Sequence, residues 1–222
     1  MVKIEKAWIH NTIKLFFPIV LGLGTIGLVC YLMKPSLRAE YFSLVSAYFF
    51  PPLGKESVIP LGVLRGIHPL VMALSIAFVD FIVALFLVWN YDYAKGIPLI
   101  GKFMDKVEKI GKTSSNKYSW VEPLRFIGIV LFVMIPFQGS GGLVGSIVGR
   151  LIGMNPWHTV LAITIGAVIG TTIIAYSADS ILSVLNSNIF GGILILIILI
   201  ISGILIYIYM KTNKKKKEKN SE

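Results

Sequence analysis

Four long apolar segments dominate the pattern of hydrophobic and polar positions along this chain. They contain a single Asp, Glu, Lys or Arg among them, which is Asp80. A helix that crosses a bilayer needs about 20 mostly apolar residues, and the segments have that length. The pattern therefore predicts about four transmembrane helices, at Leu15–Met33, Pro69–Trp89, Pro156–Tyr176 and Ile189–Met210.

A shorter apolar segment, Tyr41–Phe50, ends at Pro51 and Pro52 before it could cross a bilayer. The chain then continues into a second short apolar stretch, Val58–Leu64. Proline breaks a helix because it lacks a backbone donor and collides with the preceding turn. We therefore expect two half-helices joined at a polar tip, which is a re-entrant hairpin.

A second interrupted segment, Pro123–Ile135, stops at Pro136 and at a glycine-rich stretch around Gly139, and then continues to Gly153. Non-helical backbone at membrane depth is tolerated only where it is buried in protein or faces water. This segment therefore predicts a second re-entrant hairpin.

A short sequence repeat links the two interrupted regions. Gly62–Pro69 has a near-copy 87 residues later, Gly149–Pro156, with glycine, leucine, glycine and proline at the same positions. Each copy follows a break rich in proline or glycine and precedes a long apolar segment. Broken apolar segments at matching positions of two halves are typical of secondary transporters, whose binding site lies where the breaks meet.

The composition supports a membrane protein, since 55% of residues are hydrophobic and 14% are charged, against about 25% charged in soluble domains. We expect an all-α integral membrane protein with a single transmembrane domain over residues 1–210. Its halves are expected at about 36–90 and 118–177, and 211–222 as a disordered basic tail. The expected location is the cell membrane, with multiple passes.

The net charge of +10 is concentrated in two groups of six lysines, within 95–117 and 211–219. Basic loops lie on the cytoplasmic side of membranes. If both hairpins re-enter, both groups and both termini fall in the cytoplasm, and a lysine-free turn at Ser177–Asn188 lies outside. The hairpins then enter from opposite faces, as an inverted repeat. The lysines are expected to meet anionic lipid headgroups, and nothing indicates nucleic acid.

Asp80 is the first candidate for a functional residue, because ionisable groups inside a membrane are costly and often functional. Ala73, Ala77 and Ala84 share its helical stripe, and small residues allow another helix to approach closely. Asp80 is therefore expected to face the protein interior. It could exchange a proton, or it could be a structural staple that bonds to a hairpin backbone.

Polar residues also occur at the predicted hairpin tips: Lys55 and Glu56 in the first, Gln138 and Ser140 in the second. If the hairpins meet, these groups converge with Asp80 and could bind an ion or a polar substrate. The alternative is that the charged pair simply solvates a loop at the water boundary.

Three arginines could contact phosphate or lipid headgroups near the membrane surfaces: Arg65, Arg125 and Arg150. The alternative is that each extends its charge to the interface without a ligand.

Glycines recur every four residues after the second break, which favours close helix packing and would also permit a homodimer. They are Gly141, Gly145, Gly149 and Gly153.

Cys30 is the single cysteine, and the three histidines show no metal-ligand spacing. Nucleotide-binding and hydrolase motifs are missing as well. We therefore expect no metal site, no cofactor and no enzymatic activity.

The segments Glu56–Gly62, Gly66–Pro69 and Ile135–Gly142 resemble the two halves of the small multidrug export proteins. That family is in turn similar to the DedA/VTT superfamily. The resemblance implies two opposed re-entrant hairpins and a transport function. In DedA-like members, acids of the first hairpin and arginines of the second are linked to proton-dependent transport.

Glu56 matches the acidic position of that pattern in kind, and Arg125 is the nearest candidate for the arginine. The second tip, Gln138-Gly139-Ser140, carries no arginine and so departs from the pattern.

Three functions follow as alternatives. The first is a secondary exporter of a small molecule, with or without proton coupling. The second is a lipid scramblase or flippase of the DedA/VTT type. The third is a membrane scaffold that transports nothing.

Overall fold

The computed structural model describes residues 2–50, 53–91, 121–136 and 141–187, together with Ile197 and Ile201. The chain divides into two compact units, Met1–Tyr176 and Ser177–Glu222, and the fold described below is that of the first. Several predicted features lie outside the described residues: the lysine-rich segment 95–117, nearly all of the span 189–210, the tail 211–222, and Pro51, Pro52, Gln138, Gly139 and Ser140.

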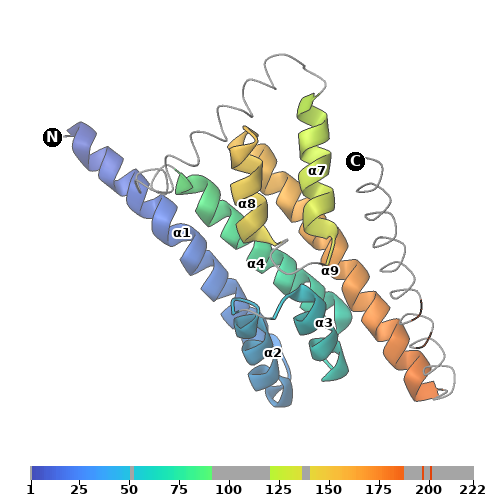
Figure 1. Ribbon diagram of the computed structural model, residues 1–222. Coiled ribbons are helices and arrows are strands. Elements are labelled where there is room, and N and C mark those ends of the chain that lie inside the picture. The colour runs from blue at the N-terminus through green and yellow to red at the C-terminus, as the bar shows by residue number, and fades with distance from the viewer. Residues whose placement is uncertain are drawn as a thin grey trace, which may run out of the picture. The chain divides into compact units, whose positions relative to one another are not determined.

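Over the described ranges the protein is all-helical, as the sequence predicts, and contains no strand. Seven helices are described there, coloured along the chain in Figure 1: α1 (Val2–Leu32), α2 (Pro35–Ala47), α3 (Lys55–Leu64), α4 (Pro69–Trp89), α7 (Val121–Met134), α8 (Gly142–Leu151) and α9 (Pro156–Ser187).

Three of these helices are long and apolar enough to cross a membrane, over Thr12–Leu32, Pro69–Trp89 and Pro156–Leu185. They correspond to the first three predicted spans. The third helix corrects one expectation, because the segment expected to turn at Ser177–Asn188 remains helical through Ser187. That segment contains no glycine or proline that would end a helix.

The two interrupted segments form pairs of short helices. α2 and α3 have 13 and 10 residues, and α7 and α8 have 14 and 10. At about 1.5 Å per residue, none spans the roughly 30 Å of hydrocarbon in a bilayer. Lys55 and Glu56, expected at a tip, lie inside the first turn of α3.

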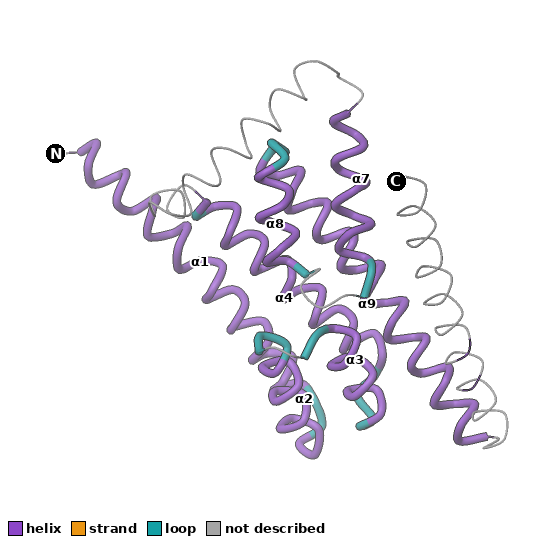
Figure 2. The backbone as a smooth tube through the Cα atoms, viewed as in Figure 1, coloured by secondary structure: helices purple, strands orange, loops and turns teal. Residues whose placement is uncertain are grey.

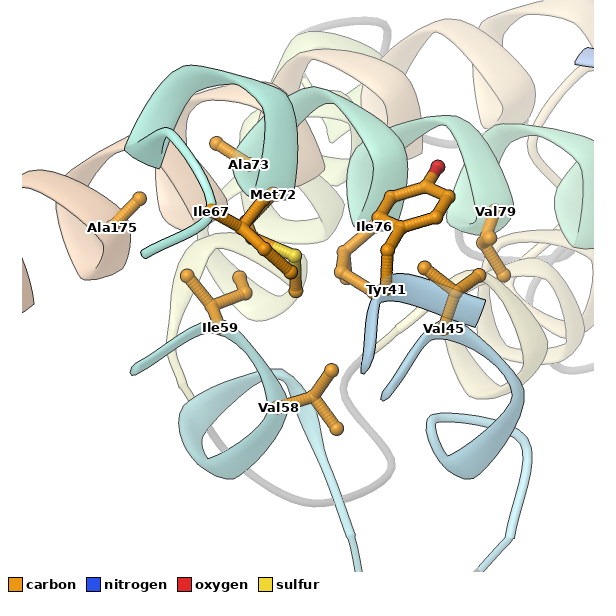
Figure 3. Close-up of a cluster of buried hydrophobic side chains, with 10 residues drawn as sticks. All are labelled: Tyr41, Val45, Val58, Ile59, Ile67, Met72, Ala73, Ile76, Val79 and Ala175. Carbon is orange, nitrogen blue, oxygen red and sulfur yellow. The ribbon is translucent and has the colours of Figure 1, made fainter. Parts of the chain in front are cut away.

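Helix α4 is the centre of the first unit. α1, α3 and α8 all pack against it, as the backbone trace in Figure 2 makes visible. One hydrophobic cluster lies where α2 and α3 meet α4 and includes Tyr41, Ile59, Met72 and Ile76, shown in Figure 3. A second joins α4 to α7 and α9 through smaller residues such as Ala77 and Ala167. α4 therefore has separate packing surfaces for the two short-helix pairs.

The turns that follow α3 and α8 have matching backbone geometry. Gly66 and Gly153 are left-handed, with φ of 85° and 80°. The residues that end the helices also agree: Arg65 has φ −82° and ψ 4°, and Ile152 has φ −77° and ψ 5°. Left-handed backbone favours glycine because it has no Cβ. The 87-residue sequence repeat therefore encodes one turn twice.

The packing inside each turn is repeated as well. A Cβ added to Gly62 would lie 2.6 Å from the side chain of Met72, and one added to Gly149 would lie 2.6 Å from that of Thr159. Thr159 follows Met72 by the same 87 residues. Each glycine therefore allows a short helix to pack closely on the long helix that follows it.

Candidate functional site

Asp80 lies near the middle of α4, and only 2% of its surface is exposed. Its Oδ1 accepts a hydrogen bond of 2.7 Å from the backbone N–H of Gly142 and one of 2.8 Å from the hydroxyl of Tyr48. Its Oδ2 is buried and finds no hydrogen-bond partner in the part of the chain that the structure describes. The carboxyl group thus ties both short-helix pairs to α4, and one of its acceptors receives no hydrogen bond from the described residues.

The approach of α8 to Asp80 depends on glycine. Gly142 is the first residue of α8, and a Cβ there would collide with the backbone carbonyl of Asp80. A Cβ on Gly141 would lie 2.5 Å from Asp80 Oδ1 and 2.6 Å from the Tyr48 hydroxyl. The glycines therefore bring the positive end of the helix α8 onto the carboxylate, an arrangement that the helix dipole stabilises.

Lys55 begins α3 and is 1% exposed. Its ammonium group donates to the backbone carbonyl of Val133, in the last turn of α7. A cation is favourable at the carbonyl end of a helix. Lys55 also attracts Asp80 and Glu56 electrostatically. It therefore connects the first short-helix pair to the second, in addition to the contact through Asp80.

Glu56 follows in the first turn of α3. Its carboxylate folds back over Gly54, where a Cβ would collide with both of its oxygens. The negative charge therefore lies at the positive end of α3. Its Oε2 is buried and, among the described residues, has no hydrogen-bond partner.

The polar cluster, defined as Tyr48, Lys55, Glu56 and Asp80, comes entirely from the first predicted half of the protein, at about 36–90. The positions 87 residues after Tyr48, Lys55 and Asp80 are occupied by Ile135, Gly142 and Ala167. The backbone of the two repeated turns is thus similar, whereas the ionisable side chains of the polar cluster occur in the first half only.

Three of the predicted site residues, Lys55, Glu56 and Asp80, are thus brought together. The small residues predicted to share the face of Asp80, namely Ala73, Ala77 and Ala84, are all buried. Tyr48 was missed by the sequence reasoning. The available signal was a hydroxyl just before the Pro51 break, where a hairpin tip was already expected.

The predicted arginines lie elsewhere. Arg65 pairs with Glu40 at 2.5 Å, and both side chains are exposed. Arg150 donates to the carbonyl of Met154 at 3.2 Å and lies 4.6 Å over the ring of Tyr91.

Arg125 lies near the start of α7, away from the helix end that Lys55 contacts. Pro136 follows α7 and is exposed.

The described residues contain no group of three or more His, Cys, Asp or Glu side chains that could hold a metal ion. In the described part of the chain, apolar cavities border α4, and two of them are large enough for a small molecule. The larger, about 550 Å³, lies between α1, α2, α4 and α9. The smaller, about 390 Å³, lies between α1, α4 and the start of α8.

Comparison with known proteins gives one family. The family described as "Putative small multi-drug export protein" matches residues 56–173, a range that contains Glu56 and Asp80 of the polar cluster and both repeated turns. No curated protein and no solved structure matches the chain.

Proposed function

Because this chain belongs to the small multi-drug export protein family, we propose that it is a secondary exporter of a small molecule whose site is the polar cluster around Asp80. Three long apolar helices and the family together identify a membrane protein of an export family. The observation that carries the finer proposal is the buried Oδ2 of Asp80, which has no hydrogen-bond partner among the described residues and lies where both short-helix pairs meet α4.

We further propose that the two short-helix pairs are re-entrant hairpins that enter from opposite faces, with both termini in the cytoplasm. The support is geometric. Both α3 and α8 are too short to cross, both pack against α4, α8 begins at Asp80 near its middle, and each short helix ends in the same glycine turn. A polar cluster at these helix beginnings is then at mid-membrane depth, where transporters bind their substrates.

The proposed cycle uses Asp80 in two states. With a proton on Oδ2, the buried group is neutral, and its burial is less costly than that of a charge. Without the proton, the carboxylate needs a positive or donating group at Oδ2, which the substrate supplies. Proton and substrate therefore compete for one oxygen, and a proton gradient would drive substrate in the opposite direction. The exchange takes place beside the other members of the polar cluster, Lys55, Glu56 and Tyr48.

The test is proton-coupled flux in liposomes that contain the purified protein. Substrates from a panel of small molecules are added under a pH gradient, and proton movement is followed with a fluorescent pH indicator. We expect flux with the wild type and none with Asp80→Asn. Arg65→Gln, which removes an exposed ion pair only, serves as the matched control and should keep full flux.

Equal flux for Asp80→Asn and wild type would overturn the assignment of the site. Lipid scrambling is tested in the same vesicles with fluorescent lipids and an impermeant quencher. Gradient-independent lipid movement without solute flux would contradict the exporter and favour the scramblase.

A further inference from the structure

The smaller apolar cavity is lined in part by residues that directly neighbour the Asp80 site in the sequence. Its lining includes Phe49, Val79 and Leu143. These residues are the chain neighbours of Tyr48, Asp80 and Gly142, the three groups joined by hydrogen bonds at the carboxylate. Asp80 itself is not part of the lining, and the cavity wall lies one residue away in the chain from each of the three groups at the carboxylate.

The cavity has the size and character of a small-molecule site. Its volume is about 390 Å³, within the range of about 300–1,000 Å³ that is usual for ligand pockets. Its walls are apolar and come from α1, α4 and the beginning of α8: Ile19, Leu23, Val79, Val83 and Leu143, with Phe49 after α2. An occupant would therefore present an apolar body to these walls.

The charges beside the cavity favour a cation over an anion. The positive ends of α3 and α8 already face carboxylates of the chain, Glu56 and Asp80, so neither helix end is left to attract an anionic ligand. The ammonium of Lys55 is engaged with the Val133 carbonyl. What remains is one buried acceptor oxygen on each carboxylate, without a partner among the described residues.

We propose that this cavity and Asp80 together bind a small organic cation, with the apolar body of the ligand in the cavity and its positive group at the carboxylate. The inference rests on the proposed function in that it names the class of molecule exported. It also makes a claim about binding that holds whether or not transport is measured. Two carboxylates face one ammonium in the cluster, so a bound cation would balance the charge.

The test is equilibrium binding of tetraphenylphosphonium to the full-length protein in nanodiscs, with empty nanodiscs subtracted. Two further probes separate the contributions of charge and apolar area. Tetraphenylborate has the same shape and the opposite charge, and tetramethylphosphonium has the charge without the apolar body. We expect saturable binding of tetraphenylphosphonium alone, and about tenfold or greater loss of affinity in Asp80→Asn.

Asp80→Asn retains an oxygen that can accept from Gly142 and Tyr48, so the fold should survive while the charge is removed. The cavity is tested with Val83→Trp, which fills it from α4. Leu74→Trp is the matched control, because it fills the larger cavity from the same helix. We expect Val83→Trp to weaken tetraphenylphosphonium binding by about tenfold and Leu74→Trp to leave it unchanged.

Equal binding of tetraphenylborate, unchanged affinity in Asp80→Asn, or loss with Leu74→Trp instead of Val83→Trp would overturn the inference. The outcome is separable from that of the proposed function. Cation binding without any flux would support the inference and contradict the proposed exporter function. Asp80-dependent flux of a neutral solute without cation binding would support the exporter function and contradict the inference.

Discussion

Asp80 and Gly142 are 62 residues apart in the sequence and are joined by a hydrogen bond of 2.7 Å from the Gly142 N–H to Asp80 Oδ1. The carboxylate of one helix thereby caps the first turn of another. A side chain that normally caps its own helix here caps α8 from α4. The same atom accepts from Tyr48 at the end of α2. Asp80 therefore supplies both a negative charge and the acceptor atom that joins α2, α4 and α8, and substitutions can separate these two contributions.

Asp80→Ala and Asp80→Asn should differ in stability. Alanine leaves the Gly142 N–H and the Tyr48 hydroxyl without an acceptor, at about 1–3 kcal/mol for each buried group. Asparagine keeps the acceptor oxygen. Thermal unfolding in detergent should show a loss of about 5 °C or more for alanine and a much smaller loss for asparagine. Equal losses would mean that the negative charge, and not the acceptor, holds α8 in place.

Gly142→Ala tests the close approach of α8 to α4. The added Cβ would collide with the Asp80 carbonyl, and overpacking of this kind costs about 1–3 kcal/mol. The matched control is Gly128→Ala in α7, where an added Cβ meets nothing within 4 Å. In that helix interior alanine should be neutral or stabilising, by up to about 1 kcal/mol. The unfolding temperatures of the two variants should therefore move in different directions.

Gly66 and Gly153 should respond alike, because each has the left-handed backbone of the same repeated turn. Alanine at either position is expected to cost about 1–2 kcal/mol. Asparagine, which tolerates this backbone conformation better, should cost less at both. Thermal unfolding of the four single variants checks the pattern. A large effect at one glycine and none at the other would contradict the equivalence of the two turns.

The sequence could predict the helices and the break points because those features are local. Apolar length sets the spans, and proline favours the end of a helix, as at Pro136 just after α7. The burial of Asp80 also followed from local spacing, since Ala73, Ala77 and Ala84 share its helical face. The 87-residue sequence repeat coincides with two turns of matching backbone geometry, at Gly66 and Gly153.

The partners of the site could not be predicted in the same way. Lys55 binds a main-chain carbonyl at Val133, 78 positions away. Because every residue has such a carbonyl, the sequence does not indicate which one the ammonium group contacts. Tyr48 meets Asp80 only because α2 ends beside the middle of α4. From the sequence, a turn is expected after Tyr176, where a crossing segment of sufficient length ends, whereas α9 continues to Ser187 because no glycine or proline in that segment ends the helix.

Lys55 and Asp80 should be energetically coupled. Lys55→Met removes the ammonium that attracts Asp80, and Asp80→Asn removes the charge that it faces. If the two groups act together, the double variant should lose less stability than the sum of the single variants, by about 0.5–3 kcal/mol. Unfolding free energies of the four proteins in detergent give this value. Strict additivity would mean that Lys55 matters only through its bond to Val133.

The proposed opposite entry of the two hairpins makes a prediction about which turns face which side of the membrane. Lys34 lies in the turn between α1 and α2, and Asn155 lies in the turn between α8 and α9. With Cys30 replaced by serine, Lys34→Cys should react in intact cells with an impermeant maleimide. Asn155→Cys should react only after the membrane is opened, because the positive-inside rule assigns its turn to the cytoplasm. Gly66→Cys would place a Cβ in left-handed backbone, so Lys34 is the better reporter for the first hairpin. Labelling of both cysteines from the same side would mean that the pairs α2–α3 and α7–α8 enter from one face, and the proposed inverted repeat would be wrong.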